Sequence, residues 1–204
     1  IETLIGGGQT DTFEVSDGTT YSGVIDGGGG ANDEVDFTGV TSAVTVRFGG
    51  GGSDWDLSRI NVITGNDQTT LGLASGTNTW TLEGAASGEV ETVPPTGEDA
   101  LFQGTLSFTG VSALHGGSGE DTFEATGTTV FTGLLKGGAD STNTLDLSGF
   151  TDPTTLVLGG DTGGWNFTEI RDFVGNNDAT LGTSHGTNTW TLNQAQGGTL
   201  SHNP

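Results

Sequence analysis

The sequence predicts an all-β fold, and more specifically a parallel β-solenoid built from coils of about 22 residues. Glycine clusters recur along the chain in steps of 21 and 22 residues, beginning at Gly6, Gly27 and Gly49 and again at Gly116, Gly137 and Gly159. Short runs rich in Val, Ile, Phe and Thr separate the clusters, and no window shows the 3.6-residue period of a helix. Segments of this length can each form one coil that stacks on the next through strand pairing at roughly 4.8 Å.

The expected strands lie between the glycine clusters. In the first half of the chain they are Thr12–Val15, Tyr21–Asp26, Val35–Phe37, Val44–Phe48, Thr79–Leu82 and Leu106–Phe108. Steps of 22 residues continue to Leu71-Gly72 and Pro94-Pro95, where we expect breaks between coils. The side chains expected in the core are Phe13, Ile25, Val35, Trp80, Leu82, Phe123, Leu135, Leu145, Trp190 and Leu192.

The chain contains two copies of one unit, related without gaps by an offset of 110 residues. The word GTNTWTL occurs at Gly76–Leu82 and again at Gly186–Leu192. We therefore divide the chain into a first repeat unit, residues 1–110, and a second, residues 111–204. The second unit is expected to be C-terminally incomplete, because it ends at Pro204, the counterpart of Pro94. Since about 100 residues is also the size of an immunoglobulin-like domain, the alternative fold is two tandem β-sandwich domains.

Composition excludes several classes of function. Four Lys and Arg residues face 26 Asp and Glu residues, and a net charge of −22 repels nucleic acid and anionic membranes while it favours cations. The absence of cysteine excludes disulfides and thiol catalysis, and no apolar run is long enough to span a membrane. The three histidines, His115, His185 and His202, align with unrelated residues of the other unit, so the sequence does not predict an enzyme.

Some charged positions change sign between the two units. Asp26 aligns with Lys136, and Arg59 aligns with Glu169. A functional site that both units share would hold its charges constant. We therefore interpret these side chains as solvated surface.

A candidate calcium site lies at the start of the second unit. Residues Gly116–Glu124 match G-G-x-G-x-D-x-U-x, the calcium-binding nonapeptide of RTX proteins, in which glycine carbonyls and a carboxylate surround the ion. The candidate ligands are Gly117, Gly119 and Asp121, Asp140 and Asn143 from the next coil, and Asp11 and Asp33 in weaker copies of the motif. The alternative is that these are β-turns in which Asp or Asn caps the backbone.

A second candidate site is the word that both units share. Trp80 and Trp190, with Asn78 and Asn188 nearby, could form a platform on which a sugar stacks. The alternative is structural, with each indole packed beneath a neighbouring coil.

Residues Gly116–Phe150 and Asn177–Leu192 resemble the tandem repeats of giant secreted bacterial surface proteins, of the adhesin-like, haemagglutinin-like or RTX-like kind. The resemblance implies an extracellular location, a long array, and a role as stalk, fibre or adhesin scaffold. The partners that it implies are neighbouring repeats of the same chain, further copies in self-assembled fibres, and cell-surface glycans. Calcium is the one cofactor that it suggests.

Overall fold

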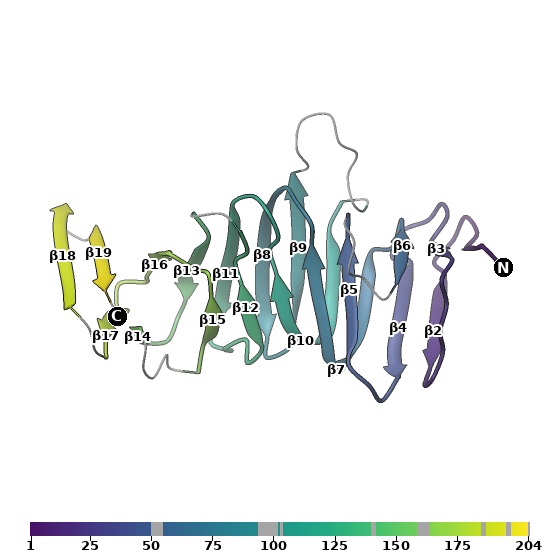
Figure 1. The fold of residues 1–204 in the computed structure, drawn as a ribbon, viewed down its shortest axis with the longest axis horizontal. Coiled ribbons are helices and arrows are strands. Elements are labelled where there is room, and N and C mark those ends of the chain that lie inside the picture. The colour runs from purple at the N-terminus through teal and green to yellow at the C-terminus, as the bar shows by residue number, and fades with distance from the viewer. Residues whose placement is uncertain are drawn as a thin grey trace.

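The protein is all-β. The computed structural model describes residues 1–49, 55–93, 102, 104–139, 142–158 and 164–184, together with the backbone of 187–194 and 197–203. No helix occurs among these residues, and the strands lie side by side along the long axis of the molecule (Figure 1).

The strands of the first unit are β1 (Thr3–Ile5), β2 (Thr12–Ser16), β3 (Val24–Asp26), β4 (Glu34–Gly39), β5 (Val44–Phe48), β6 (Asp56–Ser58), β7 (Val62–Leu73), β8 (Thr77–Gly84) and β9 (Ser87–Val93). They are followed by β10 (Leu106–His115), β11 (Asp121–Gly127), β12 (Leu134–Lys136), β13 (Thr144–Phe150), β14 (Thr155–Leu158), β15 (Asn166–Thr168), β16 (Asp172–Val174), β17 (Thr180–Thr183), β18 (Thr187–Gln194) and β19 (Gly197–Asn203). Each of the expected runs in the first half therefore contains or overlaps a strand.

Most strand pairs are parallel and join successive segments of the chain. In the first unit, β1, β3 and β6 pair in that order, with Leu4 beside Ile25 and Ile25 beside Leu57. In the second unit, Leu114 lies beside Leu135 and Leu135 beside Phe167, at positions exactly 110 residues later. The two units therefore adopt the same register here, as the repeat predicts.

A second row of strands also repeats between the units. In the first unit the register runs from Phe13 to Val35 to Ile63, through strands β2, β4 and β7. Its counterpart runs from Phe123 to Leu145 to Phe173, through β11, β13 and β16. A third row pairs β5 with β7 and, in the second unit, β14 with β17.

The spacing of the coils differs from the expected uniform 22 residues. Phe13 and Val35 are 22 positions apart, but Val35 and its next partner Ile63 are 28 apart. The expected break at Leu71-Gly72 is wrong, because β7 runs through it without interruption. The first end of β7 pairs with β4 and the second with β5, and Leu71 is fully buried, so one long strand serves two rows.

The sheets are mixed, because each unit contains one antiparallel hairpin. Strand β8 pairs with β9 so that Trp80 faces Val90, and β18 pairs with β19 so that Trp190 faces Leu200. The sequence analysis expected β8 but missed β9. The segment Ser87–Val93 is rich in Glu and Gly, and it becomes a strand because it is held between β8 and β10.

The boundary between the units lies inside a strand. Strand β10 begins at Leu106 in the first unit and ends at His115 in the second, and it pairs with β7 along much of its length. Its first half also pairs with β9 and its second half with β12. The 12-stranded sheet of the described residues thus contains strands of both units, which does not fit two separate sandwich domains.

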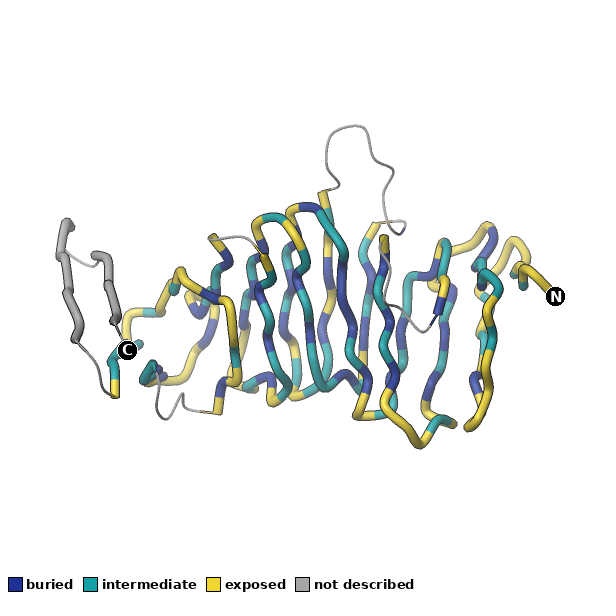
Figure 2. Tube along the Cα trace, viewed as in Figure 1, coloured by how far each residue is buried: buried dark blue, intermediate teal, exposed yellow. Residues whose placement is uncertain are grey.

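The core forms where side chains of neighbouring strands stack on the inside, and buried and exposed positions alternate along the central strands (Figure 2). Seven of the residues expected in the core are buried: Ile25, Val35, Trp80, Leu82, Phe123, Leu135 and Leu145. Phe13 is only partly buried, because its strand β2 pairs on one side alone, with β4. Trp190 and Leu192 lie outside the residues whose side chains are described.

Candidate functional site

The aspartate of the nonapeptide-like motif lies inside the molecule. Asp121 is fully buried, and the Nδ2 group of Asn78 donates a hydrogen bond of 2.6 Å to its Oδ1. The same Nδ2 group also contacts the carbonyl oxygen of Gly116 at 3.1 Å. The Asp121 carboxylate therefore binds the strand before the turn as well as belonging to the turn.

Side-chain amides and carboxylates of neighbouring coils form a ladder at this corner. The Oδ1 atom of Asn143 accepts the backbone N–H of Asp121 at 3.0 Å, and its Nδ2 donates to the carbonyl oxygen of Glu169 at 3.2 Å. In the first unit, Oδ1 of Asp33 accepts the backbone N–H of Asp11 at 2.9 Å. Asp33 and Asn143 occupy equivalent positions, so both units use this contact to join successive turns.

The glycines of the motif allow the turns to pack closely. Gly117 and Gly119 have φ values of +102° and +122°, which side chains rarely tolerate. A Cβ atom on Gly117 would lie 2.2 Å from the carbonyl oxygen of Leu73, and one on Gly119 would lie 2.1 Å from that of Gly76. The carbonyl oxygen of Gly117 accepts the backbone N–H of Ala139 at 3.0 Å, so that atom already serves the contact between coils.

These side chains do not form a calcium cage. Calcium requires about six to eight oxygen ligands, whereas the Oδ1 atoms of Asp121, Asn143 and Asp33 each face an N–H donor. Asp11 caps its own turn, with its Oδ2 accepting the N–H of Gly7 at 2.6 Å. Asp140 lies outside the described residues, and among those described no group of three Asp, Glu, His or Cys side chains could hold a metal ion. The geometry fits the capped-turn alternative better.

The tryptophan of the shared word is a core residue. Trp80 and Asn78 both have no exposed surface, so the interpretation of a sugar platform is wrong for these two residues. Trp80 stacks on Phe123, with ring centroids 5.9 Å apart, and meets Phe108 edge-on at 6.1 Å. Trp190 and Asn188 lie outside the residues whose side chains are described.

The positions that change sign between the units are partners, which corrects their interpretation as solvated surface. Arg59 donates from Nε to Oδ1 of Asp26 at 2.6 Å, and Lys136 lies 3.8 Å from a carboxylate oxygen of Glu169. Arg59 and Glu169 share the left-handed backbone conformation, with φ values of 53° and 59°. The signal was present in the sequence, because the two positions change sign together.

The carboxylate of each pair has a second task. In the first unit Oδ1 of Asp26 accepts the backbone N–H of Gly28 at 3.0 Å, and in the second Oε2 of Glu169 accepts that of Gly138, also at 3.0 Å. The two glycines are equivalent, so the same turn is capped from opposite members of the pair. The hydrogen bonds from Arg59, with a smaller contribution from Gly28, lower the pKa of Asp26 although partial burial opposes this.

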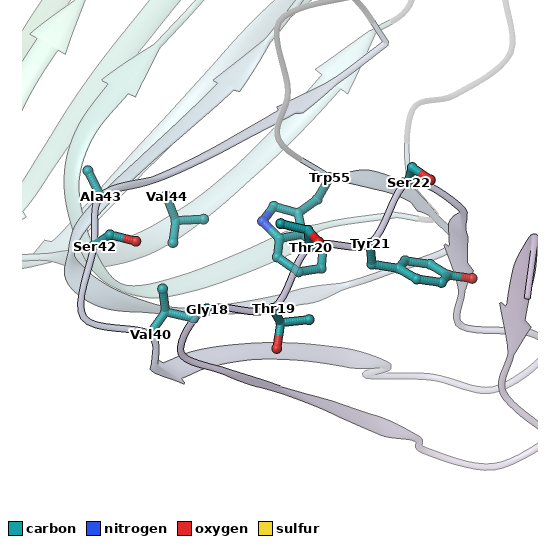
Figure 3. A pocket seen from close by; sticks show the side chains of 10 residues that line it. All are labelled: Gly18, Thr19, Thr20, Tyr21, Ser22, Val40, Ser42, Ala43, Val44 and Trp55. Carbon is teal, nitrogen blue, oxygen red and sulfur yellow. The ribbon is translucent and has the colours of Figure 1, made fainter.

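The first unit contains a surface pocket that the sequence analysis missed. Its volume is about 520 Å³, and two loops and one tryptophan enclose it (Figure 3). The lining residues are Gly18, Thr19, Thr20, Tyr21, Ser22, Val40, Ser42, Ala43, Val44 and Trp55. In the view of Figure 3, Val44 and Ser42 lie on one side of the indole of Trp55, and Tyr21 and Ser22 lie on the other.

Both loops of this pocket are fixed by hydrogen bonds. The Nδ2 group of Asn66 donates to the carbonyl oxygens of Val40 and Ser42 at 2.8 and 2.7 Å. Oδ1 of Asp17 accepts the backbone N–H and the hydroxyl of Thr41, each at 2.9 Å. These two bonds lower the pKa of Asp17, since they favour its charged form.

In the part of the chain that the structure describes, no helix is long and apolar enough to cross a membrane. Comparisons with models of protein families, with curated proteins and with solved structures found no match to this chain.

Proposed function

We propose that this chain is a structural tandem-repeat segment of an extracellular bacterial surface protein, serving as a stalk, fibre or adhesin scaffold. On this proposal the repeats form a parallel β-solenoid into which one hairpin per unit is inserted. The observation that carries the proposal is the continuity of the sheet across the boundary between the units. The extracellular location rests on the resemblance of the repeats to those of secreted bacterial proteins.

Strand β10 supports a rigid connection between the units. A chain of separate domains would have a linker at the boundary, whereas here the boundary lies within a paired strand. Further hydrogen bonds join the units beside it, including one of 3.0 Å from the backbone N–H of Ser118 to the carbonyl oxygen of Ala74. A repeat array whose units contact only their neighbours extends in one direction. Such an array can hold a fixed distance between its ends.

The distribution of polar groups also supports a structural role. The aspartates and asparagines that both units share cap turns or join coils, and the sign-changing charges form pairs. The main features of the repeat are thus explained without a ligand or a catalytic step, and we propose no enzymatic activity. The partners expected on this proposal are neighbouring repeats, with self-assembled fibres and cell-surface glycans as further expectations.

The experiment compares arrays of different length in solution. Chains of two and four repeat units are prepared, and their maximum dimension is measured by small-angle X-ray scattering. A stalk requires the dimension to grow in proportion to the number of units.

The matched control is a four-unit array with a flexible Gly-Ser linker inserted after Gly110, which interrupts β10 and its counterparts. The uninterrupted array should be longer than this control. Equal dimensions for the two arrays would contradict the proposal.

A further inference from the structure

We propose that the pocket of the first unit, between loops 18–22 and 40–44 and Trp55, is a binding site for one neutral saccharide unit. This inference does not depend on the proposed structural role. It rests on the chemistry of the lining, on the fixed geometry of the loops and on a comparison with the second unit.

The lining combines hydroxyl groups with aromatic and aliphatic surface. Thr19, Thr20, Ser22 and Ser42 supply hydroxyls, and none of these hydroxyls takes part in a hydrogen bond within the described part of the chain. Each can both donate and accept, as can the hydroxyls of a sugar. Tyr21 and Trp55 provide ring surface for the C–H groups of a sugar. The volume of about 520 Å³ falls in the range of small-molecule sites.

The charge of the pocket selects a neutral ligand. No Asp, Glu, Lys, Arg or His lines it, so neither a cation nor an anion would find an opposite charge within the pocket. The net charge of −22 on the whole chain further disfavours anions. Neutral hydroxylated molecules remain, and a saccharide unit is the class that matches hydroxyls and aromatic surface together.

The second unit provides an internal comparison, because its equivalent residues fill the same place. Phe150 stands where the first unit has Val40, and its ring meets Trp165 edge-on at 5.7 Å. In the first unit the edge partner of Trp55 is Phe37 instead, at 5.3 Å. The aromatic partner has thus moved to the other side of the indole, away from the pocket.

A second replacement has the same effect. Thr20 and Tyr21 of the first unit correspond to Val130 and Phe131, so the second unit loses two hydroxyls here. Phe131 has no exposed surface, whereas Tyr21 is partly exposed at the pocket. We therefore expect one binding site in this chain, located in the first unit.

The test uses saturation-transfer NMR on the full chain, with glucose, galactose, mannose and N-acetylglucosamine as probes at up to about 20 mM. At least one of these should give a saturable signal. Glucuronic acid and glucosamine, the charged relatives, should bind more weakly than their neutral counterparts. Failure of every neutral sugar, or stronger binding of a charged relative, would overturn the inference.

The location is tested with variants that copy the second unit. Val40→Phe combined with Thr20→Val should reduce the saturable signal at least tenfold. Because the added ring could disturb folding, Thr20→Ala combined with Ser42→Ala provides a second test at two exposed positions. Thr128→Val, at an exposed position of the second unit, is the matched control and should leave binding unchanged. An unchanged signal in the folded pocket variants would overturn the assignment.

Discussion

The indole of Trp80 joins three strands that are distant in sequence. It lies on β8, stacks on Phe123 of β11 and contacts Phe108 of β10. All three rings are buried. A single side chain thus contributes to the contact between the two repeat units as well as to the core of the first.

Replacing Trp80 with alanine should destabilise the protein strongly. Removal of a fully buried tryptophan leaves a cavity among the rings, at a cost of about 3–5 kcal/mol in the free energy of unfolding. Urea denaturation followed by circular dichroism measures this loss. Glu83→Ala, at an exposed position of the same strand, is the control and should change the free energy little. A similar small effect for both variants would show that Trp80 is not a core residue.

The pair Asp26–Arg59 can be exchanged for the pair that the second unit uses. Asp26→Lys alone and Arg59→Glu alone should each lower the melting temperature, because each places like charges together and leaves one task of the carboxylate changed. The double variant restores opposite charges, with Glu at position 59 able to cap Gly28 as Glu169 caps Gly138. Its melting temperature should recover most of the loss.

Glu83→Lys controls for the change in net charge, because residue 83 is exposed and lies on another strand. It should not reproduce the loss seen with Asp26→Lys. If the double variant melts at the sum of the two single losses, the side chains are not coupled.

At the scale of elements, the β8–β9 hairpin determines how the units meet. Strand β9 is antiparallel to both of its neighbours and fills the space between β8 and β10. Gly88 of β9 lies between Leu82 and Phe108 in the register. The absence of a side chain on Gly88 leaves room for the Phe108 ring, so a small residue at one point allows two strands to approach.

Gly88→Ala should therefore weaken this junction. The added Cβ would lie 2.1 Å from the carbonyl oxygen of Thr81 and 2.9 Å from the ring of Phe108, so backbone and ring must shift. Overpacking of this kind costs about 1–3 kcal/mol. Thermal and urea denaturation measure the effect. Gly29→Ala is the matched control, because a Cβ there meets nothing within 4 Å, and equal stability of both variants would contradict the packing argument.

The glycine turns lead to a prediction about calcium. Since the described Asp and Asn side chains face N–H donors, the melting temperature in calcium should equal that in a chelator at constant ionic strength. Asp121→Asn should lower the melting temperature to the same extent in both solutions, because it alters the contact with Asn78. A calcium-dependent rise that Asp121→Asn abolishes would instead establish the turn as a metal site.

At the scale of the whole molecule, the elongated stack carries a net charge of −22. Carboxylates repel one another along its length, and the only two ion pairs among the described residues offset few of these charges. Salt should therefore affect the stability of the whole stack.

The melting temperature should rise as sodium chloride increases from about 10 mM to 150 mM. Over this range the screening length falls from roughly 30 Å to 8 Å, so repulsion between distant carboxylates weakens. Differential scanning calorimetry at a series of salt concentrations measures the change. A melting temperature that falls with salt would show that attractive pairs outweigh the net repulsion.

The sequence by itself determined the all-β class, the 110-residue offset and most of the strands and core positions. These follow from local rules, since alternation along a strand and glycine at tight turns depend on neighbouring residues. The burial of Val35, Trp80 and Leu145 could be predicted in this way. The capped turn at Asp121 was one of two alternatives that the motif allowed.

The tertiary structure alone decided which segments lie side by side. The insertion of β9 between β8 and β10, the partnership of Asp26 with Arg59 and the pocket beside Trp55 all join residues from separate coils. A period in the sequence gives the average length of a coil but not the longer second step, because loops of different length can close the same turn of the stack. Contacts between coils depend on this stacking order, which no local pattern contains.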